Sequence, residues 1–123
     1  MRVLLDECVP RPQKRELPEH EVSTVQDMGW AGTRNGALLK LVRQAGFDAF
    51  VTTDRKIEQQ QNIAAAQIPL VVLCALSNHL DALLPLVPQL KAAIGRVKPG
   101  HVIHCTLAEG NDPDRGGPDL PST

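Results

Sequence analysis

Five short segments rich in apolar residues predict β-strands. They cover residues 2–6, 21–25, 49–54, 70–75 and 101–106. Residues 70–75 form a continuous apolar run, which is typical of a central parallel strand that is covered on both faces. Residues 21–25 are half polar, which predicts a strand nearer the edge of the sheet.

Apolar residues between these segments recur at helical spacing. One helix is expected to be capped by Asn35 and ended by Gly46. Its apolar positions are Leu38, Leu41, Val42 and Ala45. Further helices are expected before Leu17 and over residues 58–66.

The last helical pattern carries two prolines. We expect Ser77 or Asn78 to cap this helix and Gly95 to close it. Pro85 and Pro88 must kink or split it, because proline lacks the backbone N–H and clashes with the preceding turn. Strands that alternate with helices in this way predict a three-layer α/β/α domain with a mostly parallel central sheet.

The composition divides the chain into a domain and a tail. Residues 108–123 are mostly Gly, Pro, Asp and Ser, which predicts a disordered acidic tail after a domain of residues 1–107. From Glu109 onward, four acidic residues and one arginine give a net charge of −3. The whole chain has a net charge of −1, so the domain carries about +2, which neither requires nor excludes nucleic acid.

Composition also excludes several function classes. Aromatic residues make up only 2% of the chain, so base stacking on an aromatic platform is not expected. The three cysteines lack zinc-ligand spacing, and free thiols suit a reducing cytoplasm. Asp6 and Glu7 interrupt the first apolar run, so it is not a signal peptide, and no apolar run reaches the length of a membrane span.

Two of the predicted strands end in aspartate, since Asp6 follows the first strand and Asp54 the third. Ligands of open parallel α/β sheets bind beyond the carboxyl ends of the strands, where these two carboxylates would meet. Mg²⁺ or Mn²⁺ would offset the repulsion between them and suits carboxylate ligands without His or Cys. The alternative is that each aspartate only caps the helix that follows it. For either residue alone the capping role is favoured, whereas for the pair the capping role and the metal site carry equal weight.

Other polar residues near the predicted strand ends are candidates that also have ordinary roles. Asp27 follows the second strand and is either a third ligand or a turn former before Gly29. Glu7 is either an oxygen donor or a solvated neighbour of Asp6, and the alternation of side chains favours the solvated position. The candidates for a supporting role are Glu7, Thr53 and Asn62. The candidate RNA-binding residues are Arg11, Arg34, Arg55 and Lys56. The alternative for each of them is an ordinary solvated surface charge.

Several segments carry motifs in an order typical of one family. Residues 4–10 are similar to the motif LLDENLP, and residues 25–32 are similar to VRDLGWAG. Residues 35–39 are similar to NGELL, residues 49–57 to a strand that ends in TxDRNL, and residues 60–62 to the QQN that follows it. Together these motifs, over about residues 2–103, resemble those of PIN-like domains of the bacterial toxin–antitoxin type.

The resemblance implies a Mg²⁺- or Mn²⁺-dependent ribonuclease with an acidic cluster on a parallel sheet. The catalytic and metal-binding residues would then be Asp6, Asp27 and Asp54. The implied partners are an RNA substrate and a cognate antitoxin protein in the cytoplasm, and a homodimer is compatible with the resemblance. Two positions depart from the family pattern: Ala37 replaces the acid of NGELL, and Pro12 interrupts the first helix.

Three hypotheses for the function are open at this point. The first is a metal-dependent endoribonuclease that acts as the toxin of a type II toxin–antitoxin pair. The alternative is a degenerate PIN-like binding module, weakly active or inactive, that acts through a protein partner. A phospho-receiver domain fits least, because Lys98 precedes the last predicted strand, whereas a receiver needs a lysine just after it.

Overall fold

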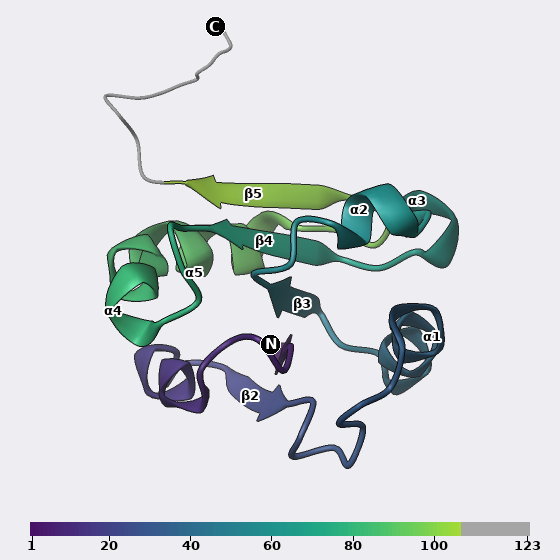
Figure 1. Cartoon of the computed structure of the whole chain (residues 1–123), viewed down its shortest axis with the longest axis horizontal. Coiled ribbons are helices and arrows are strands. Elements are labelled where there is room, and N and C mark those ends of the chain that lie inside the picture. The colour runs from purple at the N-terminus through teal and green to yellow at the C-terminus, as the bar shows by residue number, and fades with distance from the viewer. Residues whose placement is uncertain (107–123) are drawn as a thin grey trace, which may run out of the picture.

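A computed structural model describes residues 1–106 and shows a five-stranded sheet with helices on both faces (Figure 1). All neighbouring strands pair in parallel, in the order β2-β1-β3-β4-β5. The strands are β1 (Arg2–Leu5), β2 (Glu21–Thr24), β3 (Ala49–Thr52), β4 (Leu70–Cys74) and β5 (Val102–Thr106). The predicted three-layer α/β fold and the edge position of the second strand are therefore confirmed.

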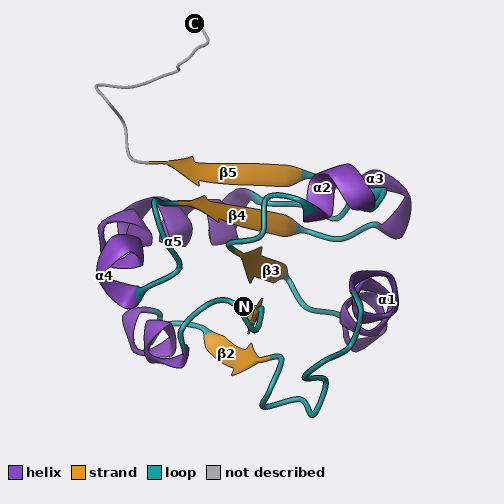
Figure 2. Ribbon diagram, in the orientation of Figure 1, coloured by secondary structure: helices purple, strands orange, loops and turns teal. Residues whose placement is uncertain are grey.

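Each face of the sheet has its own apolar core, covered by a separate group of helices (Figure 2). One face is covered by α1 (Asn35–Ala45), α2 (Ile57–Gln60) and α3 (Ile63–Ala66). The other face is covered by the 3₁₀-helices η1 (Arg11–Glu16) and η2 (Leu84–Leu86), with α4 (Leu80–Leu83) and α5 (Val87–Arg96). Successive strand residues alternate between the two cores, so Leu4 and Phe50 face α1 whereas Leu5 and Val51 face α5.

Helix α1 agrees with the prediction at its end but not at its start. It begins at Asn35 itself, and Arg34, which occupies the N-cap position, makes no side-chain capping bond. The predicted Asn35 cap is therefore wrong. Gly46 ends the helix as predicted, because its φ of 74° lies in the left-handed region that glycine adopts without strain.

The helix predicted over residues 58–66 is in fact two short helices, α2 and α3. Gln61 lies between them in an extended conformation, with φ −126° and ψ 144°. Asn62 then caps α3, since its Oδ1 accepts the backbone N–H of Ala65 at 3.0 Å. The prediction of one continuous helix failed because this local side-chain bond competes with helical continuation.

The last helical pattern is split at its two prolines, as predicted, into α4, η2 and α5. The predicted ends of this pattern are wrong. His79, rather than Ser77 or Asn78, occupies the N-cap position of α4, and it makes no side-chain capping bond. Helix α5 continues through Gly95 to Arg96, so the glycine does not close it.

The carboxyl ends of all five parallel strands lie along one side of the sheet, which we call the carboxyl edge. The loops that follow β1, β2, β3 and β4 lie along this edge, as predicted. Within residues 1–106, no helix is both long and apolar enough to cross a membrane. The predicted tail, residues 108–123, lies outside the described residues.

Candidate functional site

The first candidate acid, Asp6, is buried where β1 ends and is only 9% exposed. Its Oδ2 accepts a hydrogen bond from the Thr52 hydroxyl at 2.8 Å, and its Oδ1 accepts the backbone N–H of Glu7 at 2.8 Å. Burial raises the pKa of the Asp6 carboxyl, and the bonds from Thr52 and Glu7 only partly oppose this shift. A cation beside Asp6 would therefore stabilise a charge that burial disfavours.

The Thr52 hydroxyl connects Asp6 to the second candidate acid, Asp54. Strands β1 and β3 are direct neighbours, with Leu5 opposite Val51. At the end of β3, Thr52 Oγ1 donates its hydrogen to Asp6 and accepts the backbone N–H of Asp54 at 3.0 Å. The structure thus joins the Asp6 carboxylate to the backbone of Asp54 through Thr52 at the carboxyl edge, and we call these three residues the Asp6–Thr52–Asp54 cluster.

The carboxylate of Asp54 is partly exposed and has a local partner. Its Oδ1 accepts the backbone N–H of Lys56 at 2.9 Å, which is the geometry of an Asx turn. No hydrogen bond or ion pair from residues 1–106 engages its Oδ2. Asp54 therefore shapes the loop after β3 with one oxygen and presents the other at the carboxyl edge.

Cys8 lies beside the cluster, and the sequence reasoning missed it. Its Sγ is 3.4 Å from Thr52 Oγ1 and 3.7 Å from Asp6 Oδ2, and it accepts the backbone N–H of Thr53 at 3.5 Å. The signal available in the sequence was its position two residues after Asp6. Thr53, a predicted supporting residue, contributes its backbone N–H to this sulfur.

Asp27 is engaged in a separate set of contacts. Its Oδ2 accepts the backbone N–H of Thr24 at 3.0 Å, while Thr24 Oγ1 accepts the backbone N–H of Asp27 at 2.9 Å, a reciprocal pair like a capping box. Arg11 and Lys14 each form an ion pair with its carboxylate at 3.0 Å. The Thr24 N–H and then Lys14 lower the pKa of Asp27 to about 2. The charge of Asp27 is thus already balanced by two cations from η1, and Asp27 forms no hydrogen bond with the residues of the Asp6–Thr52–Asp54 cluster.

The other candidates lie around the cluster in different roles. Glu7 is exposed, and its Oε1 accepts the backbone N–H of Gly32 at 2.8 Å. Asn62 uses its side-chain oxygen to cap α3, as described above. Arg11 is paired with Asp27. The predicted RNA-binding residues that are exposed and form no ion pair within residues 1–106 are Arg34, Arg55 and Lys56.

The donor set of the cluster fits a divalent cation that keeps much of its water. Among the described residues, no group of three or more His, Cys, Asp or Glu side chains is arranged to hold a metal ion. Asp6 and Asp54 offer two carboxylates, and burial makes a nearby positive charge favourable for Asp6. Mg²⁺ commonly binds through one or two carboxylates and completes its shell with water and substrate phosphates.

Comparisons of this chain with family models, with curated proteins and with solved structures gave no match. The resemblance to PIN-like domains therefore stays a prediction that depends on the quoted motifs. The fold and the contacts of the cluster come from the structure alone, and any function assigned to them is a proposal.

Proposed function

We propose that this protein is a metal-dependent endoribonuclease of the PIN-like type, with its site at the carboxyl edge of the sheet. The observation that supports this proposal best is the Asp6–Thr52–Asp54 cluster. It places two carboxylates at the ends of adjacent parallel strands, which is where open α/β sheets bind their ligands.

In this proposal Asp6 and Asp54 hold Mg²⁺ or Mn²⁺. When bound, such an ion activates water and offsets charge on the phosphate that is cleaved. Thr52 positions the buried carboxylate of Asp6 through its hydroxyl and orients the loop of Asp54 by accepting its N–H. Arg55 and Lys56 directly follow Asp54 and are exposed, so they are suited to bind neighbouring phosphates of the RNA.

We expect the cleavage to be slow. Ala37 stands where the family motif NGELL has its acidic residue, and it is exposed in the first turn of α1. Asp27, the third predicted ligand, is neutralised by Arg11 and Lys14. With only two carboxylates available, metal affinity is low and the phosphate of bound RNA is needed to complete the coordination.

The proposal includes the biological setting that the resemblance implies. The protein acts in the cytoplasm as the toxin of a type II toxin–antitoxin pair and is neutralised by a cognate antitoxin protein. Self-association as a homodimer is compatible with this setting.

A second candidate function is a PIN-like binding module without turnover, acting through a protein partner. It is favoured by one specific observation, the engagement of Asp27 by Thr24, Arg11 and Lys14. In the described part of the chain, this leaves fewer acids for a metal than the resemblance implies.

Metal binding separates the two candidates. Mn²⁺ is titrated into the full chain by calorimetry, and single-stranded RNA is incubated with the protein and Mg²⁺ or Mn²⁺, with EDTA as the metal-free control. We expect wild type to bind Mn²⁺ and to cleave RNA slowly. Asp54→Asn loses both properties but keeps its circular dichroism spectrum, because an asparagine oxygen can still accept the Lys56 N–H.

A matched control lies at the opposite end of the same strand. Asp48 precedes β3, and its Oδ2 accepts the backbone N–H of Arg2 at 2.8 Å. Asp48→Asn removes one carboxylate charge but leaves the carboxyl edge unchanged, so metal binding and cleavage should persist.

A second test restores the acidic residue that the family motif has at the position of Ala37. Ala37→Glu should raise the cleavage rate if a carboxylate at this position reaches the metal. If wild type shows no metal-dependent cleavage and Ala37→Glu does not restore it, the endoribonuclease proposal is wrong and the binding module replaces it.

A further inference from the structure

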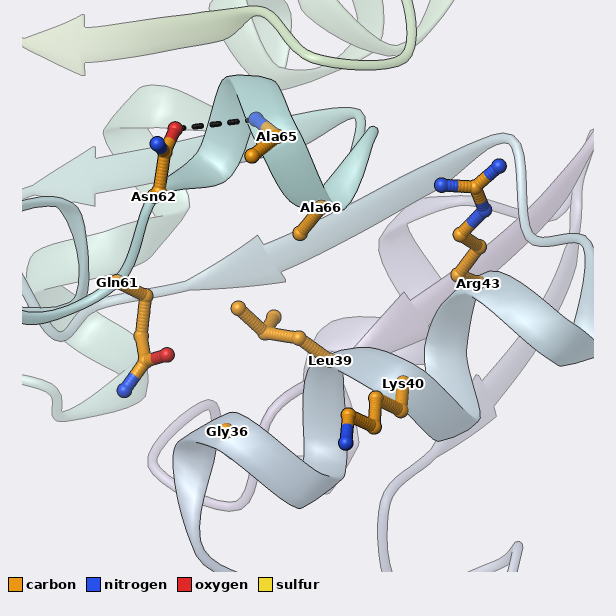
Figure 3. Close-up of a pocket in the computed structure, with 8 residues that line it drawn as sticks. All are labelled: Gly36, Leu39, Lys40, Arg43, Gln61, Asn62, Ala65 and Ala66. Atoms are coloured by element: carbon orange, nitrogen blue, oxygen red, sulfur yellow. Dashed lines mark hydrogen bonds between the residues drawn. The ribbon is translucent and has the colours of Figure 1, made fainter.

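A groove of about 490 Å³ runs between α1 and the segment that contains α3 (Figure 3). Its α1 wall consists of residues that share one face of the helix, at i, i+3, i+4 and i+7. They are Gly36, Leu39, Lys40 and Arg43. The opposite wall consists of Gln61, Asn62, Ala65 and Ala66.

The groove is open because several of its wall residues lack bulk. Gly36 has no side chain, and a Cβ built there would meet only the Gln61 amide, at 3.7 and 4.0 Å. Ala65 and Ala66 end at Cβ on the opposite wall. A bulkier residue at any of these positions would fill the space. The small residues therefore keep the groove open for an elongated ligand.

The charge of the groove is positive. Lys40 and Arg43 are its only charged lining residues, both are exposed, and neither forms an ion pair within residues 1–106. Cations three residues apart on a helix lie close together and repel each other. An anionic ligand between them would relieve this repulsion, and no acidic residue lines the groove to compete with it.

The groove leads away from the carboxyl edge. Helix α1 connects two parallel strands, β2 and β3, so it begins at the carboxyl edge and runs back across the sheet. Gly36 therefore lies at the end nearer the Asp6–Thr52–Asp54 cluster, and Arg43 lies about 10 Å further along the helix axis at 1.5 Å per residue. That length suits a few nucleotides of a single strand.

The chemistry of the groove favours the nucleic-acid backbone over the bases. No aromatic side chain lines it. Trp30 instead packs against Phe47, with an edge-to-face geometry and ring centroids 6.3 Å apart. Without a stacking platform, binding depends on phosphate contacts and is insensitive to sequence.

We propose that the α1–α3 groove binds the part of a single-stranded RNA substrate that flanks the cleaved phosphate, with Lys40 and Arg43 as phosphate-binding residues. This inference rests on the proposed function, because it extends the same site to a longer segment of its substrate. The Gln61 amide lies at the end of the groove next to Gly36, where it can donate a hydrogen bond to the strand as it enters.

Binding is measured separately from cleavage, with the full chain in EDTA and a fluorescein-labelled oligouridylate followed by fluorescence anisotropy. The double variant Lys40→Gln/Arg43→Gln should bind more weakly than wild type at low salt. Each phosphate contact on a single strand contributes about 0.7 to the slope of log affinity against log salt, so losing two contacts reduces the slope by about 1.4. Between about 50 and about 200 mM salt, the wild-type affinity should therefore fall about 7-fold more than that of the variant.

The matched control removes the same charge from the other face of the molecule. Arg15 in η1 and Arg96 at the end of α5 are exposed on the elements that cover the other face, and Arg15→Gln/Arg96→Gln should bind RNA with wild-type affinity and salt slope. A third variant, Ala65→Leu, narrows the groove without changing charge and should also weaken binding. It keeps the α3 cap, because Asn62 accepts the backbone N–H of residue 65.

The outcomes distinguish a failure of this inference from a failure of the proposed function. If wild type binds and cleaves RNA but the groove variants match it in affinity, salt slope and cleavage, the groove inference is wrong and the endoribonuclease proposal stands. If wild type neither binds nor cleaves RNA, both are wrong. If the groove variants lose binding only to an acidic peptide, such as one with the sequence of residues 107–123, the ligand is a protein segment and the RNA assignment is refuted.

Discussion

Gln13 should oppose folding, because its side-chain amide is buried without a partner. The residue is fully buried in η1, and neither its Nε2 nor its Oε1 has a hydrogen-bond partner. It lies four residues after Val9 and four before Leu17, and both of these belong to the aliphatic core on the α5 face. Gln13→Met keeps the length and the unbranched shape of the side chain but removes the amide, so we expect this variant to be more stable than wild type.

The magnitude follows from the burial of the amide. A buried polar group without a hydrogen bond costs about 1–3 kcal/mol in protein mutational data. Methionine adapts to irregular space, so little of this gain is lost to poor packing. In a domain of this size, each 1 kcal/mol shifts the melting temperature by roughly 4–8 °C, so Gln13→Met should melt at least about 4 °C higher.

The assay is urea unfolding of the full chain, followed by circular dichroism, together with a thermal melt. Gln44→Met is the matched control, because Gln44 is exposed on α1 and the same substitution there should change stability by less than about 0.5 kcal/mol. A lower urea midpoint for Gln13→Met would refute the reasoning. It would mean that the amide is satisfied, for example by an internal water, and that its removal breaks real bonds.

Three further variants test other contacts. Thr52→Val removes the hydroxyl that donates to the buried Asp6 carboxylate. We expect the free energy of unfolding in urea to fall by about 1–3 kcal/mol and Mn²⁺ to bind more weakly in calorimetry. Unchanged values would contradict the positioning role of Thr52. The pKa of Asp27 is lowered from 3.8 to about 2, so its stabilisation is present above pH 3.8 and is lost as the pH falls towards 2. In Asp27→Asn the free energy of unfolding should therefore fall less steeply as the pH is lowered from 3.8 towards 2 than it does in wild type. The same pH dependence in both proteins would refute this account. Deletion of residues 109–123 should leave the melting temperature nearly unchanged, whereas a large drop would show that this segment docks on the domain or on a second copy.

The sheet could be predicted from local sequence because its signals are local. Each strand is a short apolar run, and the helical segments between the runs require parallel pairing. Parallel pairing then places every strand end on one edge, so the position of Asp6 and Asp54 after neighbouring strands followed from where each acid stands relative to its apolar run. The same reasoning placed β2 at the edge of the sheet, because its residues are half polar.

The contacts of Asp27 were not predictable in this way. Its position after β2 suggested proximity to the other acids, but its partners Arg11 and Lys14 come from η1, well before it in the sequence. Which cation reaches which acid depends on how η1 packs beside the loop after β2. Neither hydrophobic periodicity nor the spacing of the acids carries that information.

The errors at helix ends have a different cause. Asn35 and Asn62 are both good capping residues, and the sequence reasoning used the first and overlooked the second. In the structure Asn62 caps α3, whereas Asn35 is already inside α1. The choice depends on where the buried residues Leu38 and Ile63 must point, so the capping preference alone does not fix a boundary.

Asp6 is the residue on which the two candidate functions differ most. The Asx turn of Asp54 and the reciprocal cap of Asp27 explain those two aspartates by local structure alone. The pKa of Asp6 is raised by burial, so its ionised form opposes folding at neutral pH, and this penalty declines as the pH falls and the group takes up a proton. The bonds from Thr52 and Glu7 reach different carboxylate oxygens, so an asparagine, which has one acceptor oxygen, could accept only one of them. These two bonds give the carboxylate a structural role but only partly offset its burial, whereas a cation held between Asp6 and Asp54 would make the ionised carboxylate favourable.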